Sequence, residues 1–595
     1  MLVINRGEKH NRALELPEIV SGLLVMLVLL WQACFAGVSH AEVFHGVYTH
    51  ADQYLLSGLV WFNTLVVMIH MSCKWFRVHQ VGRFLWLQLL VGLFASIVFP
   101  CEPHYFSSVY GLRLSMVLGM LMGVFSLVNM GAYIRERRSG SVRGRSVNPA
   151  FSFFTYMVAL VLFSTALLLS PGATHEPISF VDALFMSASA TSITGLTTLD
   201  VSSAFTPFGK TVLLMDIQVG ALGVMTFTYF VLMMVGKRLA VRENVNMSSF
   251  LDQQGNSIVK PLLKAVGFVT LAAEAIGAAC LYFLWSGNTD IPQSDVLGYA
   301  IFHSVSAFCN AGITLFPENM ATHYVSDAYG VQGVMMGLMF IGAIGFGVYL
   351  ECMTRIRRRI AGKLVQRRWS THSWLVCRVT LITLLVGCLG MSLLGYLEPS
   401  LHGQHGGYGV WESLWNSVGR SAGFNLTDIA EYGIVYKLFL CVMMFVGGNP
   451  AGTGGGVYAP VVAICVLEVL RVLRGVQDVE IHNRRIARNT VDRALATVLL
   501  SIFWIGLTTM VVLLLEPDLA AQKDGLIKVF FMEVSAFTTT GYDLGAVQEI
   551  SWVSKLIVSL NMLFGRVGMF TCMLIFIRPK NPAPIRFPET RLPLS

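Results

Sequence analysis

Twelve long apolar stretches divide the chain, and they constrain its fold more than any other feature. Each is about 17 residues or longer, the length that a helix needs to cross a lipid bilayer. With 55% hydrophobic and 13% charged residues, the chain is typical of an all-α polytopic membrane protein, not of a soluble enzyme. The stretches lie near 17–37, 53–73, 83–99, 108–134, 151–171, 208–236, 259–285, 331–353, 374–396, 433–471, 492–515 and 552–577.

Positive charge is distributed unevenly between the links. Lys and Arg cluster after every second apolar stretch, at 73–83, 135–145, 236–242, 355–359 and 471–474, whereas the other links are acidic or neutral. Basic links favour the cytoplasmic side, so both termini are predicted to be cytoplasmic. Because this topology accounts for the net charge of +8, nucleic acid is not an expected partner.

Catalytic and metal-binding patterns are missing from the sequence. The 11 cysteines form no C-x-x-C pair and no metal-ligand spacing with histidine, so we interpret them as small apolar residues of packed helices. A membrane-embedded enzyme would need a cluster of His, Asp or Glu on facing helices, and none is found at usable spacing. We expect no enzymatic activity and no cofactor bound by this chain.

A short, semi-polar segment with one glycine recurs four times among the last eight apolar stretches. The glycines are 111 to 118 residues apart, and a serine precedes each by six positions. These coincident registers predict four units of span, short re-entrant segment and span, at 151–242, 243–359, 360–490 and 491–578. The glycines are Gly195, Gly312, Gly423 and Gly541, and the serines are Ser189, Ser306, Ser417 and Ser535.

Further glycines mark the second span of each unit. Pairs at 220/223, 342/345 and 565/568 are predicted to let helices pack closely. In the third unit the same place expands to "FVGGNPAGTGGGVYAP", where Pro450 and the glycines cannot continue a helix at low cost. Irregular backbone at membrane depth must be buried or line a cavity, so this span is predicted to be broken. It is not a phosphate-binding loop, because no strand precedes it.

Short helices that enter a membrane and return as extended backbone leave carbonyl groups unpaired. Four such loops around one axis would point their carbonyls at a common centre and replace the hydration shell of a cation. The C-terminal ends of the entering helices would also favour a cation. Asp200, Asp428 and Asp543 are interpreted either as acids at the outer mouth or as solvated loop residues. For Asp182 and Glu533, a role at a helix N-terminus and a role in an ion site are equally open.

These motifs together resemble the Trk/Ktr/HKT superfamily of potassium transporters. "SITGL", "SAFCNAG", "RSAGFN" and "SAFTTTGY" match its four filter loops, and "IQVGALGVMTF", "FIGAIGF", "MFVGGNPAGTGGG" and "FGRVG" match its second helices. The resemblance covers about residues 150–580. It implies four tandem membrane-pore-membrane repeats around a pseudo-fourfold pore in the bacterial inner membrane, the plasma membrane of the cell.

The resemblance also implies a filter that binds the transported ion. Superfamily members with serine in the first loop tend to favour sodium, and all four positions are glycine here, so potassium is expected and sodium is the alternative. The implied filter residues are Ser192, Ile193, Thr194, Gly195, Leu196, Cys309, Asn310, Ala311, Gly312, Ile313, Ser421, Ala422, Gly423, Phe424, Thr539, Thr540, Gly541 and Tyr542.

A gate beneath the filter is implied by the glycine-rich segment 447–456 of the third unit. The superfamily usually has Lys or Arg just after the triple glycine, but this chain has Tyr458, which puts a cationic contact from the loop in doubt. A charge within a membrane span is costly, so Arg566 is expected either to act in the cavity, as an electrostatic barrier or a gate contact, or to bond loop carbonyls. The implied gating residues are Gly447, Gly448, Asn449, Gly452, Thr453, Gly454, Gly455, Gly456 and Arg566.

The expected partners follow from the same resemblance. They are a second copy of the chain in a homodimer and a cytosolic KtrA/TrkA-like nucleotide-binding regulatory ring. ATP/ADP or NAD would bind to that ring, and potassium would be the only ion at the filter. The basic links near 236–245, 355–372 and 471–490 are the expected docking surface, and the linker 135–150 is expected to contact membrane lipid.

The amino-terminal end departs from the superfamily pattern. Residues 1–134 hold four extra spans, interpreted as stabilising or partner-docking helices, and 579–595 form a cytoplasmic tail. An ion-coupled secondary carrier for another solute remains the alternative to a pore. It would require an inverted repeat with one broken helix in each half.

Overall fold

The computed structural model describes residues 149–170, 172–221, 259–287, 291–317, 319–362, 369–397, 409–450, 452–481, 484–569 and 572–573. The predictions for the four amino-terminal spans, the linker before 149 and the carboxyl-terminal tail lie outside these residues. The described part is helical, apart from a two-residue antiparallel hairpin, β1 (Glu480–Ile481) with β2 (Arg484–Arg485).

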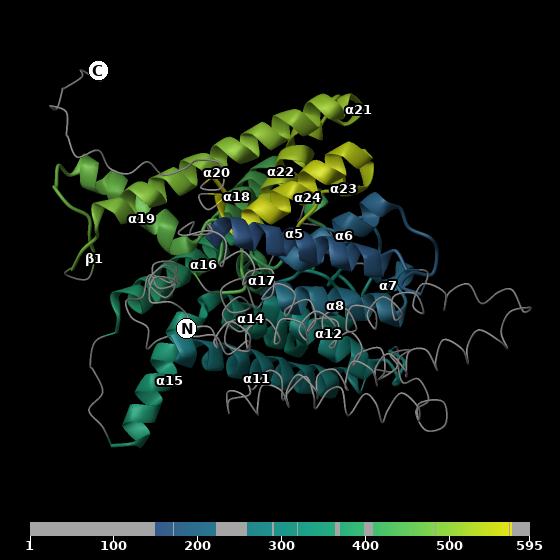
Figure 1. The fold of residues 1–595 in the computed structure, drawn as a ribbon, viewed down its shortest axis with the longest axis horizontal. Coiled ribbons are helices and arrows are strands. Elements are labelled where there is room, and N and C mark those ends of the chain that lie inside the picture. The colour runs from purple at the N-terminus through teal and green to yellow at the C-terminus, as the bar shows by residue number, and fades with distance from the viewer. Residues whose placement is uncertain are drawn as a thin grey trace, which may run out of the picture.

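The helices form four successive hairpins, each with a short helix between two longer ones (Figure 1). The first comprises α5 (Pro149–Leu168), α6 (Phe180–Ser192) and α8 (Pro207–Ala221). The others are α11 (Val259–Trp285), α12 (Val296–Cys309) and α14 (Tyr329–Ile344); α16 (Thr371–Leu397), α17 (Val410–Gly419) and α18 (Ile434–Phe445); and α20 (Arg488–Leu515), α22 (Gly525–Thr538) and α24 (Trp552–Val567).

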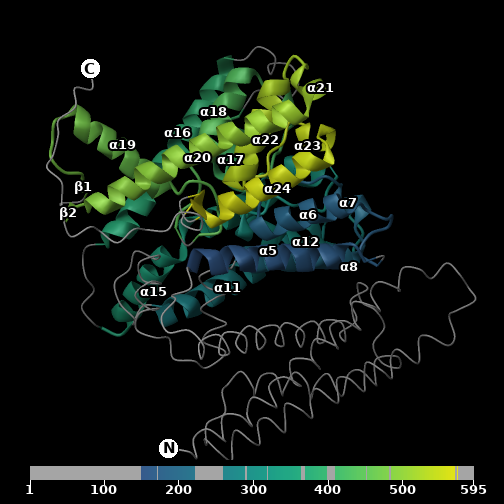
Figure 2. The same ribbon diagram turned by 45° about the horizontal axis from the view of Figure 1, so that its top comes forward.

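Smaller elements connect the hairpins or extend them. Single turns follow the short helices or precede the fourth one: α7 (Val201–Ala204), α13 (His323–Ser326), the 3-10 turn η2 (Ile429–Glu431), α21 (Pro517–Ala520) and α23 (Ala546–Glu549). Two longer helices, α15 (Phe346–Ile360) and α19 (Ala459–Leu473), lie with the β hairpin at the end of the molecule opposite α7, α21 and α23 (Figures 1 and 2).

Three helices of the described part are by themselves long and apolar enough to cross a bilayer. They span Val266–Trp285, Thr371–Leu397 and Arg488–Leu515. Many of their outward side chains are large and apolar, such as Leu389 and Leu514, which are 68% and 80% exposed. Apolar surface of this extent fits hydrocarbon and not water.

The short helices cannot cross a bilayer. They have 13, 14, 10 and 14 residues, so they are about 15 to 21 Å long, against about 30 Å of hydrocarbon. Each must therefore end inside the protein. Three of them end with a residue in the left-handed conformation, namely Ile193, Asn310 and Thr539, whose N–H groups bond carbonyls of the last turn.

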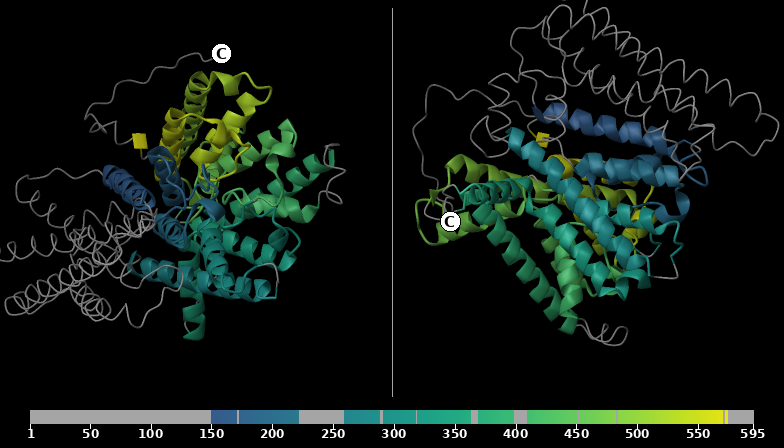
Figure 3. Two further views of the ribbon diagram at one scale, coloured as in Figure 1. Left: turned by 90° about the vertical axis from the view of Figure 1, so that its right-hand side faces the viewer. Right: turned by 90° about the horizontal axis from the view of Figure 1, so that it is seen from below.

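The hairpins close into a ring. Along the chain, the second long helix of each hairpin packs against the short helix of the next: α8 on α12, α14 on α17, α18 on α22 and finally α24 on α6. Seen end-on, the four hairpins follow one another around a centre in chain order, from blue through teal and green to yellow (Figure 3, left). Lys555 of α24 and Asp182 of α6 form an ion pair at 2.8 Å across this last contact.

Glycines let the second long helices touch the ends of the short ones. A Cβ added at Gly220, Gly342 or Gly565 would lie only 2.1, 1.9 or 1.8 Å from the carbonyl oxygen of Thr191, Phe308 or Phe537. Each of these carbonyls belongs to the residue four positions before the loop glycine. The predicted close packing is therefore present at the first glycine of each pair.

Two predicted spans are interrupted. The last one, 552–577, breaks at Gly568, which has a φ of 87° and ends α24. Residues 331–353 were expected to form one helix, but the chain breaks at Gly345, which has a φ of 97° and separates α14 from α15. A Cβ there would lie 2.6 Å from the Pro450 carbonyl oxygen, because the third unit's irregular segment passes this point. That segment does break its own span as predicted, between Phe445 and Ala459.

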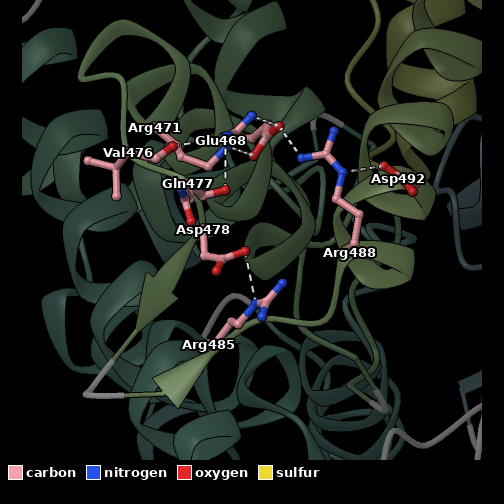
Figure 4. Close-up of polar contacts among 8 residues, drawn as sticks. All are labelled: Glu468, Arg471, Val476, Gln477, Asp478, Arg485, Arg488 and Asp492. Carbon is pink, nitrogen blue, oxygen red and sulfur yellow. Dashed lines mark hydrogen bonds and ion pairs between the residues drawn. The ribbon is translucent and has the colours of Figure 1, made fainter. Parts of the chain in front are cut away.

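A corner of ion pairs joins α19 to α20 (Figure 4). Glu468 is almost fully buried and binds Arg471 at 2.7 Å and Arg488 at 2.7 Å. Arg471 also donates to the carbonyls of Val476 and Gln477. The helix that follows the irregular segment is thus fixed to the start of the fourth unit.

Replacing Gly342 with alanine should destabilise the folded protein by about 1–3 kcal/mol, because the added methyl group meets the Phe308 carbonyl. Gly337→Ala on the same helix is the control, since nothing lies within 4 Å of its Cβ position. Thermal unfolding of the purified protein in detergent measures the difference. Equal midpoints for the two variants would contradict the packing described above.

Candidate ion-conduction site

Four glycine loops meet at the centre of the ring of helices. Gly195, Gly312, Gly423 and Gly541 have φ values of 91°, 68°, 72° and 99°, a region that glycine adopts without strain. A Cβ on each would strike a carbonyl oxygen of the next loop, in order: Ala311 at 2.6 Å, Ala422 at 2.4 Å, Thr540 at 2.1 Å and Thr194 at 2.2 Å. The contacts close a circle, and only glycine fits at each position.

The loop residues predicted from the sequence are brought together by this circle. Ser192, Ile193, Thr194 and Leu196 of the first loop are buried, as are their counterparts 309–313, 421–424 and 539–540 with Tyr542. The four loops after α6, α12, α17 and α22 thus surround one centre with main-chain groups.

The serine that precedes each glycine by six residues has two different roles. Ser189 and Ser535 accept hydrogen bonds from the N–H groups of Gly195 and Gly541, at 3.1 and 3.0 Å. Ser306 donates to the carbonyl of Ile313 at 2.6 Å. These three serines hold their loops, whereas Ser417 donates to Leu384 of α16 and so ties α17 to its neighbouring helix.

The third loop is held by other residues. Trp415 Nε1 donates to the Phe424 carbonyl at 2.8 Å, and Tyr542 Oη donates to the same oxygen at 3.3 Å. Arg420 is 5% exposed and donates to the carbonyls of Ser417 and Val446. Arg420 has no predicted role, and the sequence signal that could identify it is a charge beside an apolar helix.

The three loop aspartates cap short helices. Asp200 accepts from Ser202 N, Asp428 from Ala430 N, and Asp543 from the N–H groups that begin α23. Burial alone would raise the pKa of Asp200, but hydrogen bonds from Ser202 and Ser203 outweigh it and hold the pKa below its ordinary value. These carboxylates are therefore bonded to the protein, and Asp200 and Asp428 are also exposed.

The irregular segment of the third unit lies against the loops. Thr453 is its centre: its N–H donates to Gly342, its hydroxyl donates to the Phe308 carbonyl at 3.0 Å, and Asn310 donates to that hydroxyl at 2.8 Å. A Cβ on Gly455 would lie 1.8 Å from Thr539 Oγ1, and one on Gly454 would lie 3.5 Å from Ser421 Cβ. The segment thus touches the second, third and fourth loops.

The rest of this segment is a self-bonded turn. Gly447 N donates to Val457 O, Gly448 N donates to Gly455 O, and Gly452 N donates to Asn449 O. The Asn449 side chain donates to the Ala343 carbonyl at 3.1 Å and to Thr380 Oγ1 at 2.9 Å. Buried backbone groups are satisfied in this way without a helix.

Arg566 links the segment to the ring. It donates to the Thr453 carbonyl at 2.7 Å and to the Gly220 carbonyl at 3.1 Å. Arg566 is therefore bonded to main-chain carbonyls, one of them in the irregular segment. Tyr458, at the place of the usual basic residue, begins α19 and is 38% exposed.

Other carboxylates have structural partners. Asp182 and Ser179 form reciprocal hydrogen bonds at the start of α6, the helix N-terminal role. The same role was wrong for Glu533, which lies inside α22 and accepts from Asn561. Asp216 and Glu274, for which no role was predicted, accept hydrogen bonds from Ser164 and Gln218. Among the described residues, no group of three His, Cys, Asp or Glu side chains could hold a metal ion.

Comparison with known proteins agrees with this architecture. The family model described as "TrkH: Cation transport protein" matches residues 148–582. The chain is 31% identical over 434 residues to Ktr system potassium uptake protein B of Bacillus subtilis, covering 72% of this chain and 93% of that protein. It is also 31% identical to the protein of the same name from Vibrio alginolyticus, covering 73% and 92%.

The fold is also found among solved structures. The crystal structure of the potassium transporter TrkH from Vibrio parahaemolyticus superposes with a TM-score of 0.58, at 17% identity, over 83% of this chain and 97% of that one. The predicted resemblance is confirmed, and the chain belongs to the TrkH family of cation transport proteins.

Proposed function

We propose that this protein takes up potassium through the circle of glycine loops. The carrying observation is that four positive-φ glycines each face a carbonyl oxygen of the neighbouring loop. Main-chain oxygens gathered around one axis can replace the water around a cation. The relatives named as potassium uptake proteins support this choice of ion.

The segment 447–456 would act as the gate. It packs against three of the four loops and is held there by Arg566 and Asn310 through Thr453. Ions would pass when the segment withdraws, and its six glycines in "GGNPAGTGGG" would make that movement inexpensive. The membrane would be the bacterial inner membrane, with the α15 and α19 ends facing the cytoplasm.

Regulation would come from separate chains. The names of the relatives assign them to a Ktr system, which supports a multicomponent assembly. We propose a homodimer of this chain and a cytosolic nucleotide-binding ring that binds ATP/ADP or NAD. The ion-paired corner at Glu468 would transmit its movement, because it fixes α19, which directly follows the gate segment, to α20.

Sodium permeation is the second candidate. A more distant relative, at 25% identity, is named potassium/sodium uptake protein NtpJ, of Enterococcus hirae. A secondary carrier for another solute is less favoured, because the hairpins contact one another in a single repeating order, α8 on α12 through α24 on α6. An inverted repeat would not produce that order.

Gly195→Ala and Gly195→Ser should abolish most rubidium uptake or shift uptake toward sodium by about tenfold or more. The added Cβ lies 2.6 Å from the Ala311 oxygen and also strains a φ of 91°. Rubidium and sodium influx in cells that lack their own potassium uptake measure the effect. Gly545→Ala is the matched control, since Gly545 has a φ of 86° but open space around it. Unchanged rubidium influx together with unchanged cation preference in both Gly195 variants would refute the filter.

Arg566→Gln should raise rubidium influx several-fold, because the gate segment loses the hydrogen bond to Thr453 that holds it against the loops. The variant should keep its cation preference, since the glycine circle is untouched. Influx and preference are measured in the same cells. An influx no higher than that of the unaltered protein, at equal membrane abundance, argues against a closed gate stabilised by Arg566.

Glu468→Gln should weaken activation by the nucleotide-binding subunit of a Ktr system at least about threefold, because α19 is no longer fixed by two ion pairs. Rubidium flux into proteoliposomes is compared with and without that subunit and ATP. Asp492→Asn is the matched control, since Asp492 contacts only the exposed side of Arg488. Equal activation of both variants would contradict the proposal that the ion pairs of Glu468 transmit the movement of the regulatory subunit.

A further inference from the structure

The second glycine loop differs from the others in how its exit is anchored. In the other three loops the chain after the glycine enters a short turn capped by Asp200, Asp428 or Asp543. None of the ten residues after Gly312 is an aspartate, and Pro317 stands five residues beyond the glycine. Ser306 holds Ile313, and Asn319 donates to the Gly423 carbonyl at 3.3 Å, so the stretch between them, 314–316, needs an anchor of its own.

His303 is that anchor. It lies on α12 nine residues before Gly312 and is fully buried. Its Nε2 lies 3.0 Å from Thr314 Oγ1 and 3.3 Å from the backbone N of Leu315. Its Nδ1 lies 2.8 Å from the Tyr299 carbonyl oxygen.

The hydrogen-bond partners determine the tautomer. The Leu315 N–H can only donate, so Nε2 accepts and carries no proton. The Tyr299 carbonyl can only accept, so the proton is on Nδ1. Thr314 accepts from Phe316 N at 3.0 Å, which leaves its hydroxyl proton for Nε2. The neutral ring therefore connects the helix on one side with residues 314–316 on the other.

Aromatic rings hold the imidazole in one orientation. Phe316 stacks on it with ring centroids 4.6 Å apart and an angle of 18° between the planes, and Trp285 meets it edge-on at 5.5 Å. Tyr299 lies nearly parallel to it at 6.0 Å and also stacks on Phe316, with ring centroids 5.3 Å apart. A ring confined in this way positions its acceptor nitrogen precisely enough to define where the loop exits.

The other short helices have no polar residue at the position that corresponds to His303. The positions nine residues before their glycines are Met186, Leu414 and Met532, which are all apolar. If packing were the only requirement at position 303, an apolar residue would serve there too. His303 is the exception, and it precedes the loop that lacks an aspartate cap.

We propose that His303 is a positioning residue for the second glycine loop, whose Nε2 sets where Gly312 and the Ala311 carbonyl stand in the circle. The proposal rests on the proposed function of that circle. Loss of the acceptor lets residues 313–315 shift, and the Ala311 oxygen, which faces Gly195, moves with them. Cation preference changes as a result, while the remaining helices keep their packing.

The test compares variants that keep the hydrogen bonds of either Nε2 or Nδ1 of the His303 imidazole, but not both. Gln can place an oxygen at the Nε2 position and still accept from Leu315 and Thr314, whereas Asn reaches only the Tyr299 carbonyl. His303→Leu and His303→Asn should lower the ratio of rubidium to sodium influx about tenfold, and His303→Gln should restore most of it. Membrane abundance and the thermal midpoint of each variant are measured in parallel.

A change on the loop side provides a second test that leaves α12 intact. Thr314 is partly exposed, so Thr314→Val should fold and lower the same ratio by a smaller factor, while Thr314→Ser keeps the hydroxyl and the ratio. An unchanged ratio in His303→Leu, or in Thr314→Val if the histidine variants do not accumulate, overturns the proposal. So does a failure of His303→Gln to differ from His303→Asn.

The proposed function and the positioning role of His303 can be disproved separately. If the unaltered protein carries no rubidium, or if Gly195→Ala has no effect, the proposed function is wrong. If both behave as expected and the ratio is insensitive to His303 and Thr314, only the positioning role is wrong.

Discussion

The rest of the structure depends on the contact between each loop glycine and a carbonyl oxygen of the next loop. At Gly423 and Gly541 a Cβ would come within 2.1 and 2.2 Å of that oxygen, so even alanine would separate the loops. Backbones can approach so closely only if nothing projects between them. The short helices, their terminal caps and the surrounding spans all hold the four backbones at this distance.

The same requirement explains the second layer of glycines. For the loops to meet, the short helices must end inside the protein, and the next long helix must come against their last turn. Gly342 and Gly565 permit this, since their Cβ positions lie within 2 Å of the Phe308 and Phe537 carbonyls. In lipid, where no hydrophobic force drives helices together, such close packing is a main source of association.

Loops that leave carbonyls unpaired inside a membrane also make it possible to bury arginine side chains. Arg420 and Arg566 have no buried carboxylate partner among their hydrogen bonds, but they donate to main-chain oxygens of Ser417, Val446, Thr453 and Gly220. Each guanidinium is thereby satisfied, and the irregular segment 447–456 is held between them. The hydrogen bonds between the guanidinium groups and these oxygens lower both the free-energy cost of unpaired backbone carbonyls and that of a buried charge.

Much of this arrangement could be predicted from the sequence alone, because it depends on local chemistry that repeats along the chain. The glycine register, the apolar spans and the broken span at Pro450 all follow from residue types and spacing. Features that depend on distant segments could not be predicted. The break at Gly345 exists because Pro450 passes beside it, and Ser417 turns to α16 while its three counterparts bind loops. The sequence by itself determined that four loops must form, and only the tertiary structure decided what holds each one, because hydrogen-bond partners are chosen by proximity in space and not along the chain.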